Sequence, residues 1–407
     1  MGSEKNPEIE YLRALAVILL VMSHLPELLP FHKAVFTYIH YTYVPWTGVD
    51  LFFCISGYVV SKSLVEFLDT QKAEGNFWLA AQCFWIRRMY RLSPSCWTWL
   101  FIGILCSVFF HQTGVFNSWW QNLRSASAIL TFSGNLANQY NHLLAPNDVY
   151  WSLALEEQFY FVFPLFLLVI SGAWRWRILL ALIAIQFFIN RNPFGTPFSA
   201  MAWSFRVDPI MWGALIYIFS KSSHFSLFEP TFLKHSRLLA LVLNSLLIYL
   251  LGAIPAQLIT MPMAHGLVSL VAAIFVLMAV YQSNYVLNIP GFSSILTWLG
   301  ARSYAIYLIH MPVYRMTVEG YSRYALKIGH PFNAFYTLPM ILTATLLILL
   351  LAELNFRLIE NPLRKRGIAL SNSRLENWRN QSVGPHEKKL EIPANLKMAA
   401  SARVQQS

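Results

Sequence analysis

Long apolar segments separated by short polar ones dominate this chain of 407 residues. A helix needs roughly 20 mostly apolar residues to cross the ~30 Å hydrocarbon core of a bilayer. Segments of about that length recur about ten times, and the alternating pattern of transmembrane strands is not seen. The pattern therefore predicts an all-α, polytopic membrane protein with about ten transmembrane helices.

The predicted spans follow the apolar windows along the chain. In order, they cover residues 9–29, 46–68, 92–110, 150–170, 178–189, 201–219, 238–254, 264–281, 295–316 and 336–358. The fifth is short, so it is either a separate span, a tilted one or part of its neighbour. We find no internal repeat and no second folded domain.

The distribution of lysine and arginine among the loops predicts the orientation, because cytosolic loops are enriched in both residues. With a cytosolic amino terminus, the inner cations are Arg87, Arg88, Arg91, Arg175, Arg177, Lys221, Lys234, Arg237 and the run Arg364, Lys365 and Arg366. The outer loops carry fewer: Lys33, Arg124, Arg191, Arg323 and Lys327. We expect both termini in the cytosol and a multi-pass location in the inner (plasma) membrane.

Composition adds three expectations. The chain is 56% hydrophobic and 12% charged, with a net charge of +11. Because the cations occupy short loops between apolar segments, they indicate topology and not nucleic-acid binding. The four cysteines lie in or beside predicted spans without metal or disulfide spacing. After Gly367 the chain turns polar, so we expect a membrane core over 1–366 and a disordered cytosolic tail over 367–407.

Ionisable residues inside predicted spans are candidates for function, because burying a charge in lipid is costly. Arg13 and His24 are eleven residues apart in the first span. At 100° per residue they lie about 20° from the same helix face and about 16 Å apart along the axis. The alternative is an arginine that snorkels inward and a histidine at the outer interface.

Three carboxylates add to this set. Asp50 lies near the start of the second span, at a depth comparable to that of His24, where its carboxylate would orient the imidazole. The alternative is an acid in the first turn of a helix that is stabilised only by the helix dipole. Glu156 and Glu157 lie within the fourth span, on different sides of the helix. At least one must face the interior, either to pair with an intramembrane arginine or to bind an acceptor.

Two later spans carry further ionisable groups. Arg206 and Asp208 fit a structural ion pair in the sixth span. In the ninth, His310 is either a second proton carrier, an acceptor-binding group or an interface histidine. Glu353 in the tenth span is expected to pair with a nearby cation.

The segment FWIRRMYRLSP places Arg87, Arg88 and Arg91 among aromatic residues. Guanidinium groups bind phosphate oxygens and aromatic rings can stack on adenine, although anchoring at the inner membrane surface explains the same residues. The sequence contains no Walker loop, dinucleotide-binding glycine motif or metal-ligand cluster, which argues against an ATP-driven pump or a Rossmann enzyme.

With these segments identified, the chain resembles acyltransferase family 3, a family of membrane O-acyltransferases. The resemblance rests on the Arg13–His24 spacing and on a series of ordered motifs: GVDLFFCISGY, FWIRRMYRLSP, WSLALEEQFYFVFP, FRVDPIMWG, ARSYAIYLIH and NFRLIENPLRKR. Together they cover about residues 8 to 366. The resemblance implies a ten-helix core and transfer from acetyl-CoA or another acyl-CoA, a substrate and not a bound cofactor.

The resemblance also implies roles for single residues. Arg13 and His24 match the family's essential pair, and Asp50 matches the acid of its second helix. The arginines Arg87, Arg88 and Arg91 match those associated with the donor. Glu156 and Glu157 match the acids of the fourth segment, and His310 matches the late histidine. The chain departs from the family where Glu10 and Tyr11 stand in place of a frequent Asp-Gly.

The expected acceptor is a hydroxyl of a cell-surface glycan or lipid-linked glycan, such as O-antigen, exopolysaccharide, peptidoglycan or lipo-oligosaccharide. A small molecule such as a macrolide is the alternative acceptor, and a transporter is the alternative class. Many family members carry a fused hydrolase-like domain. Here only the short tail follows the last span, so we expect the core to complete the transfer alone or pass the acyl group to another protein. The acceptor, acyl length and oligomeric state stay open.

Overall fold

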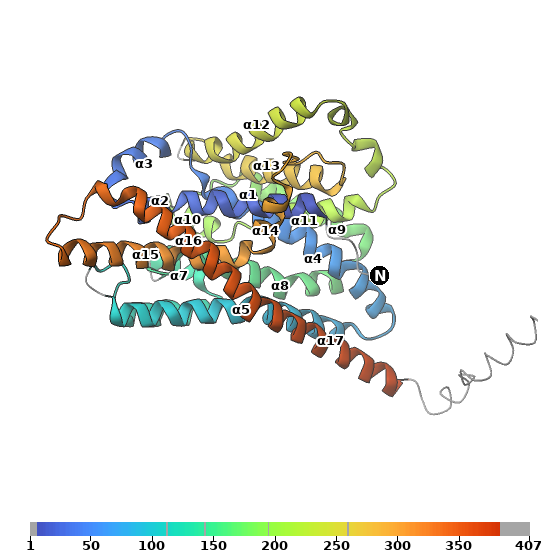
Figure 1. Cartoon of the computed structure of the whole chain (residues 1–407). Helices are drawn as coiled ribbons and strands as arrows, with labels where there is room; N and C mark the ends of the chain where they lie inside the picture. Colours follow the sequence, from blue (N-terminus) through green and yellow to red (C-terminus); the bar gives the residue numbers. More distant parts are fainter. Residues whose placement is uncertain (1–5, 111–112, 142–143, 194, 259, 383–407) are drawn as a thin grey trace, which may run out of the picture.

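The computed structural model describes residues 6–110, 113–141, 144–193, 195–258 and 260–382, which form helices and no strand (Figure 1). Among these described residues, five helical runs are long and apolar enough to cross a membrane: Pro45–Ala73, Phe77–Phe109, Asp148–Val169, Arg237–Ala256 and Ala334–Asn380. The predicted all-helical membrane protein is confirmed at this level. The number of ten spans stays a prediction.

The helices have the following bounds: α1 Pro7–Ser23, α2 Leu25–Leu28, α3 Lys33–His40, α4 Gly48–Ala73, α5 Phe77–Phe109, α6 Trp119–Leu130, α7 Gly134–Asn141, α8 Trp151–Val169, α9 Gly172–Phe188, α10 Pro197–Ser204, α11 Asp208–Ser220, α12 Arg237–Ala256, α13 Ala264–Val280, α14 Ser293–Ala301, α15 Ser303–Lys327, α16 Thr337–Asn355 and α17 Asn361–Ser382. Helix α1 lies inside the bundle, in contact with α4, α13, α14 and α15. The first predicted functional span is therefore surrounded by protein.

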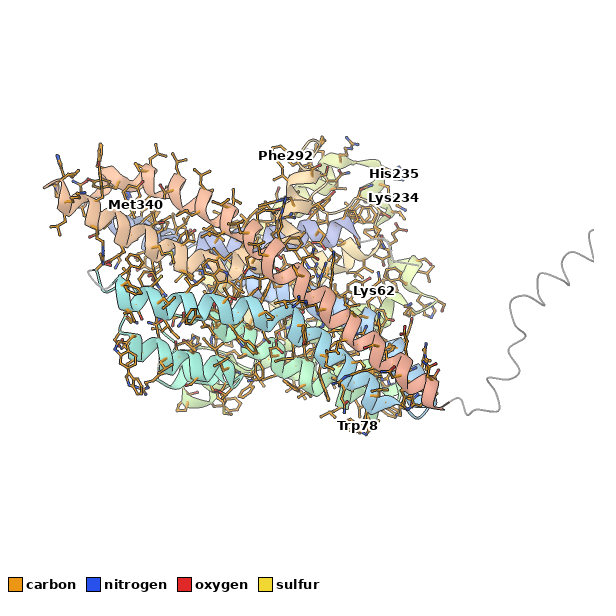
Figure 2. All side chains as sticks on the ribbon, turned by 60° about the horizontal axis from the view of Figure 1, so that its bottom comes forward. Lys62, Trp78, Lys234, His235, Phe292 and Met340 are labelled. Atoms are coloured by element: carbon orange, nitrogen blue, oxygen red, sulfur yellow. The ribbon has the colours of Figure 1, made fainter. Side chains whose placement is uncertain are left out.

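The outer surface of the bundle is apolar. Along α16, Leu338, Leu342, Leu346 and Leu350 are all exposed and follow one another at intervals of four residues, so they form one stripe. An apolar stripe of this kind on the outside of a bundle is expected where a helix faces lipid. Trp78, at the start of α5, projects outward near the end of α17 (Figure 2).

Glycines allow close contact between helices inside the bundle. A side chain on Gly57 would collide with the carbonyl of Ile210 in α11, and one on Gly213 would collide with the carbonyl of Cys54 in α4. The backbones of α4 and α11 therefore approach each other directly. Gly48 lies in the same way against the carbonyl of Ala16 in α1.

Three predicted spans are interrupted. The first ends at Ser23 and resumes as α2 after His24, because Pro26 lacks the amide proton that a continuous helix needs. The sixth breaks between α10 and α11 before Pro209, and Arg206 lies in the break. The ninth breaks at Arg302, between α14 and α15. Each interruption places an ionisable side chain where a helix ends.

Helix α5 begins at Phe77, well before the predicted start at residue 92. At 1.5 Å per residue its 33 residues are about 50 Å long, more than a bilayer core requires. Arg87, Arg88 and Arg91 therefore belong to this helix and not to a loop. The hydrophobic pattern missed the first turns because arginines interrupt it.

The tail predicted to be disordered from Gly367 is helical as far as Ser382, so that part of the prediction is wrong. Helix α17 packs along α5, where Gly367 lies against the Tyr90 ring and the Cys83 thiol donates to the Ser371 carbonyl at 3.5 Å. This contact explains why residues 367–382 are helical, because α5 covers one face of an otherwise polar helix. Residues 383–407 lie outside the described residues.

Candidate active site

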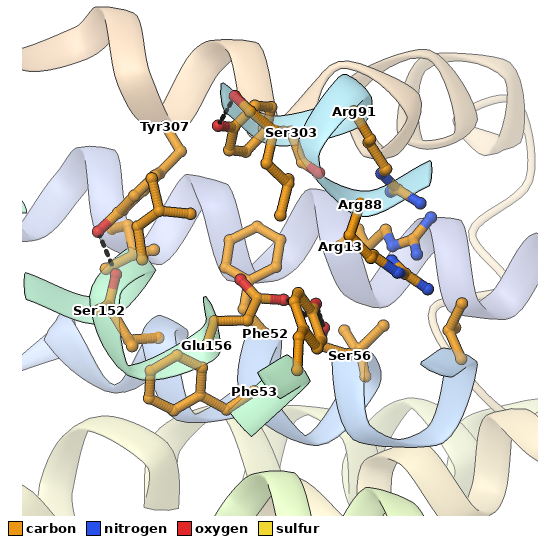
Figure 3. Close-up of a pocket in the computed structure, with 18 residues that line it drawn as sticks. Arg13, Phe52, Phe53, Ser56, Arg88, Arg91, Ser152, Glu156, Ser303 and Tyr307 are labelled. Carbon is orange, nitrogen blue, oxygen red and sulfur yellow. Dashed lines mark hydrogen bonds between the residues drawn. The ribbon is translucent and has the colours of Figure 1, made fainter. Parts of the chain in front are cut away.

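A pocket opens between α1, α4, α5, α8 and α15 and measures about 760 Å³, including its mouth (Figure 3). The guanidinium groups of Arg13, Arg88 and Arg91 gather on one side. On the other side, the Ser152 and Tyr307 hydroxyls are joined by a hydrogen bond of 2.6 Å. The pocket therefore has a cationic side and a hydroxyl-bearing side.

The cationic side of the pocket has guanidinium N–H donors that no described protein oxygen accepts. Arg13 donates to Glu10 at 2.8 Å, while Arg88 lies over the Tyr160 ring at 5.1 Å from its centroid. Among the residues that the structure describes, no protein oxygen accepts a hydrogen bond from the Arg88 or Arg91 guanidinium. Fixed guanidinium groups with free donors suit a ligand that carries phosphate or carboxylate.

A second hollow adjoins the first and contains four arginines. It lies between α4, α5 and α17, and Arg88 and Arg91 line both hollows. Arg87 stacks over the Phe67 ring at 5.4 Å, and Arg364 comes from α17. The structure thus brings together the three arginines predicted in the FWIRRMYRLSP segment. Sequence reasoning missed Arg364, which it treated only as a topology signal.

Glu156 faces the central pocket. The hydroxyl groups of Ser56 and Tyr160 both donate to its Oε1 atom, and these two hydroxyls lie 2.5 Å apart. Glu157 is buried and does not line the pocket. The two acids therefore lie on different sides of α8, as predicted, and no arginine forms a salt bridge with either within the described chain.

The two candidate histidines contact each other. His310 Nε2 lies 3.3 Å from His24 Nδ1, with ring centroids 5.1 Å apart. His310 Nδ1 lies 2.7 Å from the Tyr307 carbonyl oxygen, which can only accept a proton. His310 therefore carries its proton on Nδ1, and its Nε2 faces His24 as an acceptor.

The same reasoning assigns the His24 tautomer. Its Nδ1 lies 2.9 Å from the Leu20 carbonyl oxygen, 3.1 Å from Ser23 Oγ and 3.3 Å from His310 Nε2. The Ser23 hydroxyl donates to the Leu20 carbonyl, so all three partners are acceptors toward Nδ1. Nδ1 is therefore the protonated nitrogen in the neutral ring. The Nε2 atom of His24 keeps a free lone pair, which is what a general base or a nucleophile requires.

The histidine pair lies just beyond the hydroxyl-bearing side of the central pocket. Leu20 and Tyr307 line the pocket, and each comes one helical turn before one of the histidines. Along α1, Arg13 and Leu20 line the hollow, and His24 follows one turn beyond Leu20, just after α1 ends at Ser23.

Asp50 does not contact His24, so the predicted orienting carboxylate is wrong. Its Oδ1 lies 3.7 Å from Arg206 Nε, and both side chains are almost fully buried. The predicted pair of Arg206 and Asp208 is also wrong, because Asp208 binds Arg191 through both carboxylate oxygens. The break before α11 separates the two neighbours and turns them toward different partners.

The Arg206 guanidinium is enclosed by three tryptophans. It lies 3.9 Å from the ring centroid of Trp203, 4.2 Å from that of Trp151 and 4.7 Å from that of Trp46. Cation–π contacts are strongest when the cation is desolvated. The Asp50–Arg206 pair therefore supports the wall behind the pocket, where Trp151 adjoins Ser152.

The expected partner of Glu353 is confirmed. Arg302 and Arg357 both donate to this carboxylate, with Arg302 Nη2 at 3.2 Å from Oε1. The pair joins the break before α15 to α16 and thus has a structural role.

Comparison with known proteins identifies the family of this chain. The acyltransferase-domain family matches residues 6–354, and the chain belongs to this family. It is 28% identical to the peptidoglycan O-acetyltransferase OatA of Listeria monocytogenes over 93% of its own length and 60% of that protein. It is 27% identical to the putative peptidoglycan O-acetyltransferase YrhL of Bacillus subtilis, over 93% of this chain and 58% of the relative. No solved structure matches.

A third relative, the O-acetyltransferase OatA of Staphylococcus aureus, is 25% identical over 89% of this chain and 57% of its own length. The chain thus spans about three fifths of the length of these curated relatives. The predicted resemblance to a family of membrane acyltransferases is confirmed.

Proposed function

We propose that this protein is a membrane O-acyltransferase that moves an acetyl or other short acyl group from cytosolic acyl-CoA to a hydroxyl of an extracytoplasmic cell-wall glycan. One observation carries the proposal: a single pocket joins the arginines Arg13, Arg88 and Arg91 to the side next to His24 and His310. The names of the relatives support O-acetyl transfer and a glycan acceptor.

The proposal includes an orientation. The arginine side faces the cytosol of a bacterial cell, the histidine pair faces outward, and about ten spans cross the inner membrane. Both termini lie inside. This orientation follows the loop cations, and it places each end of the pocket on the side where its substrate is found.

The donor occupies both hollows. Its phosphates bind the arginines that line the second hollow, including Arg364, and its adenine ring has aromatic side chains nearby for stacking. The extended pantetheine arm passes Arg88 and Arg91 and carries the thioester along the central pocket toward Tyr307. The length of the arm matters, because Arg13 and His24 are about 16 Å apart along α1.

The chemical step uses the free nitrogen of His24. Its Nε2 accepts the proton of the acceptor hydroxyl while the hydroxyl oxygen attacks the thioester carbon, forming the C–O bond of the new ester. The C–S bond then breaks, and the proton passes from His24 to the departing thiolate to give free CoA. Direct attack by Nε2, with a transient acyl-imidazole, is the alternative route and leaves the same products.

The test uses the full chain in liposomes with labelled acetyl-CoA and soluble cell-wall oligosaccharides. We expect His24→Ala to reduce acetyl transfer by about 10²- to 10⁴-fold, the usual contribution of a general base. His330→Ala, at an exposed histidine outside the site, should keep full activity. Normal activity of the His24→Ala protein would overturn the mechanism.

The donor site has its own test. Arg88→Ala should raise the KM for acetyl-CoA, because the substitution removes donors from both hollows, whereas the exposed Arg177→Ala should not. The rival transporter predicts movement of substrate across the membrane without acyl-CoA, so flux without acetyl product would contradict the proposal.

A further inference from the structure

A groove is lined by residues that follow His24 in the chain, whereas Arg13 and Leu20, which precede it, line the central pocket. It is formed by α2, the turn after it and α3 on one side, and by Val115 and Val318 on the other. The central pocket reaches Leu20, one turn before His24, and the groove begins at Pro26, two residues after it. His24 therefore stands between two hollows along one stretch of chain.

Helix α3 presents one face to this groove. Lys33, Phe36, Thr37 and His40 all line it, and their spacing of three and four residues places them on a single helix face. The opposite face carries Val35, Tyr38 and Ile39, which are exposed by 55%, 76% and 40%. An eight-residue helix with these two faces is typical of a segment at a membrane surface, with its apolar face toward lipid.

The charge of the groove differs from that of the arginine hollow. Among the described residues that line the groove there are one lysine, Lys33, and one carboxylate, Glu27, whereas four arginines line the other hollow. A coenzyme with several phosphates suits the hollow with the four arginines. A balanced set of a carboxylate, an ammonium group and a hydroxyl suits a neutral polyhydroxyl ligand, whose hydroxyls both donate and accept.

Phe36 gives the groove a ring surface among these polar groups. The C–H face of a pyranose packs on such a ring, while its hydroxyls reach the polar groups around it. Small-molecule sites commonly combine an apolar surface with a few polar groups that fix the orientation of the ligand.

We propose that this groove binds the acceptor as a carbohydrate chain and presents one of its hydroxyls to Nε2 of His24. One sugar packs on Phe36, with its hydroxyls against Glu27 and Thr37, and Lys33 and His40 contact the next part of the chain. This proposal rests on the function proposed above. It names the acceptor side of the same reaction centre and the residues that select the acceptor.

The test compares two faces of one helix. In the full chain with labelled acetyl-CoA and soluble peptidoglycan oligosaccharides, Phe36→Ala should raise the acceptor KM at least fivefold and leave the acetyl-CoA KM unchanged. Tyr38→Ala, the same kind of truncation on the opposite face, should change neither constant.

A second variant controls for an unfolding of α3 by Phe36→Ala. Thr37→Val keeps the shape of the side chain and removes only the hydroxyl, whose one partner among the described residues is the Lys33 carbonyl within α3 at 2.9 Å. It too should raise the acceptor KM and spare the donor KM. Wild-type acceptor constants in both groove variants, or equal changes in Phe36→Ala and Tyr38→Ala, would overturn the groove proposal.

The failure of the groove proposal is distinguishable from that of the proposed function. If His24→Ala abolishes transfer while Phe36→Ala and Thr37→Val behave like the wild type, the acyl-transfer mechanism stands and the acceptor binds elsewhere. If His24→Ala keeps its activity, the proposed function fails before the groove is at issue, and the groove proposal falls with it.

Discussion

His310 Nε2 lies 3.3 Å from Nδ1 of His24 and is, beside the nearer Leu20 carbonyl oxygen at 2.9 Å, an acceptor for its proton, because the Tyr307 carbonyl holds the proton of His310 itself. The second histidine and the Leu20 carbonyl therefore orient the His24 ring together and leave its Nε2 atom free. In this role His310 is a positioning residue: it acts on the reaction through His24.

His310→Ala tests this relationship. We expect kcat to fall about a hundredfold, the scale of a small misplacement of a reacting group, while the KM for acetyl-CoA stays the same. His310→Gln, which keeps an acceptor at the end of its side chain, should recover part of the loss. Both constants come from initial rates of labelled acetyl transfer. Unchanged kcat in His310→Ala would mean that His24 needs no such partner.

The pair Asp50 and Arg206 predicts an effect on stability. Removing one member of a buried ion pair costs about 3–5 kcal/mol, because the other charge stays buried without a partner. Asp50→Asn should therefore lower the thermal unfolding temperature in detergent. Glu66→Gln breaks the exposed pair with Lys221 and should have little effect. A stable Asp50→Asn protein with low kcat would instead favour the catalytic role that its sequence position suggested.

The neighbours Glu156 and Glu157 predict different outcomes for one kind of substitution. Glu156→Gln weakens the bonds from Ser56 and Tyr160 at the pocket, and hydrogen bonds to a charged group are worth about 1.5–3 kcal/mol. We expect kcat/KM to fall at least tenfold. Glu157→Gln, which does not reach the pocket, should keep its kinetic constants within about twofold of the wild type. Equal kinetic effects would contradict this assignment.

The contact of α4 with α11 predicts a large effect of one methyl group. Gly57→Ala would place its Cβ against the Ile210 backbone, so the helices must separate and the protein should lose stability. Gly320→Ala is the matched control: it lies in α15 with open space around it, and should gain about 0.5–1 kcal/mol from helix propensity. Thermal unfolding of both variants in the same detergent measures the contrast.

Periodicity along single helices predicted much of the site. The separation of Glu156 from Glu157 follows from helical geometry, which is local, whereas the shared face of Arg13 and His24 stays a prediction because α1 ends at Ser23. Glu353 was expected to pair with a cation, since an isolated charge in lipid is costly.

Partners between distant segments could not be predicted in this way. Asp50 was assigned to His24 by depth alone, whereas the packing of α4 against α11 brings it to Arg206. The order of α17 and the role of Arg364 depend on the contact with α5, which leaves no signal in the hydrophobic pattern. The interruption at His24 was recognisable from Pro26, which the window of apolar residues did not weigh.

The run from Ala334 to Asn380 contains 47 residues in one nearly unbroken helical rod, about 70 Å long. More than half of it extends past the hydrocarbon core, and α17 packs along α5, so a tilt of α16 that carries this pair of helices moves their shared end through a much larger arc. The distance between two spectroscopic labels, one on this end and one on α9, should therefore change by a large amount when the helices rearrange during turnover.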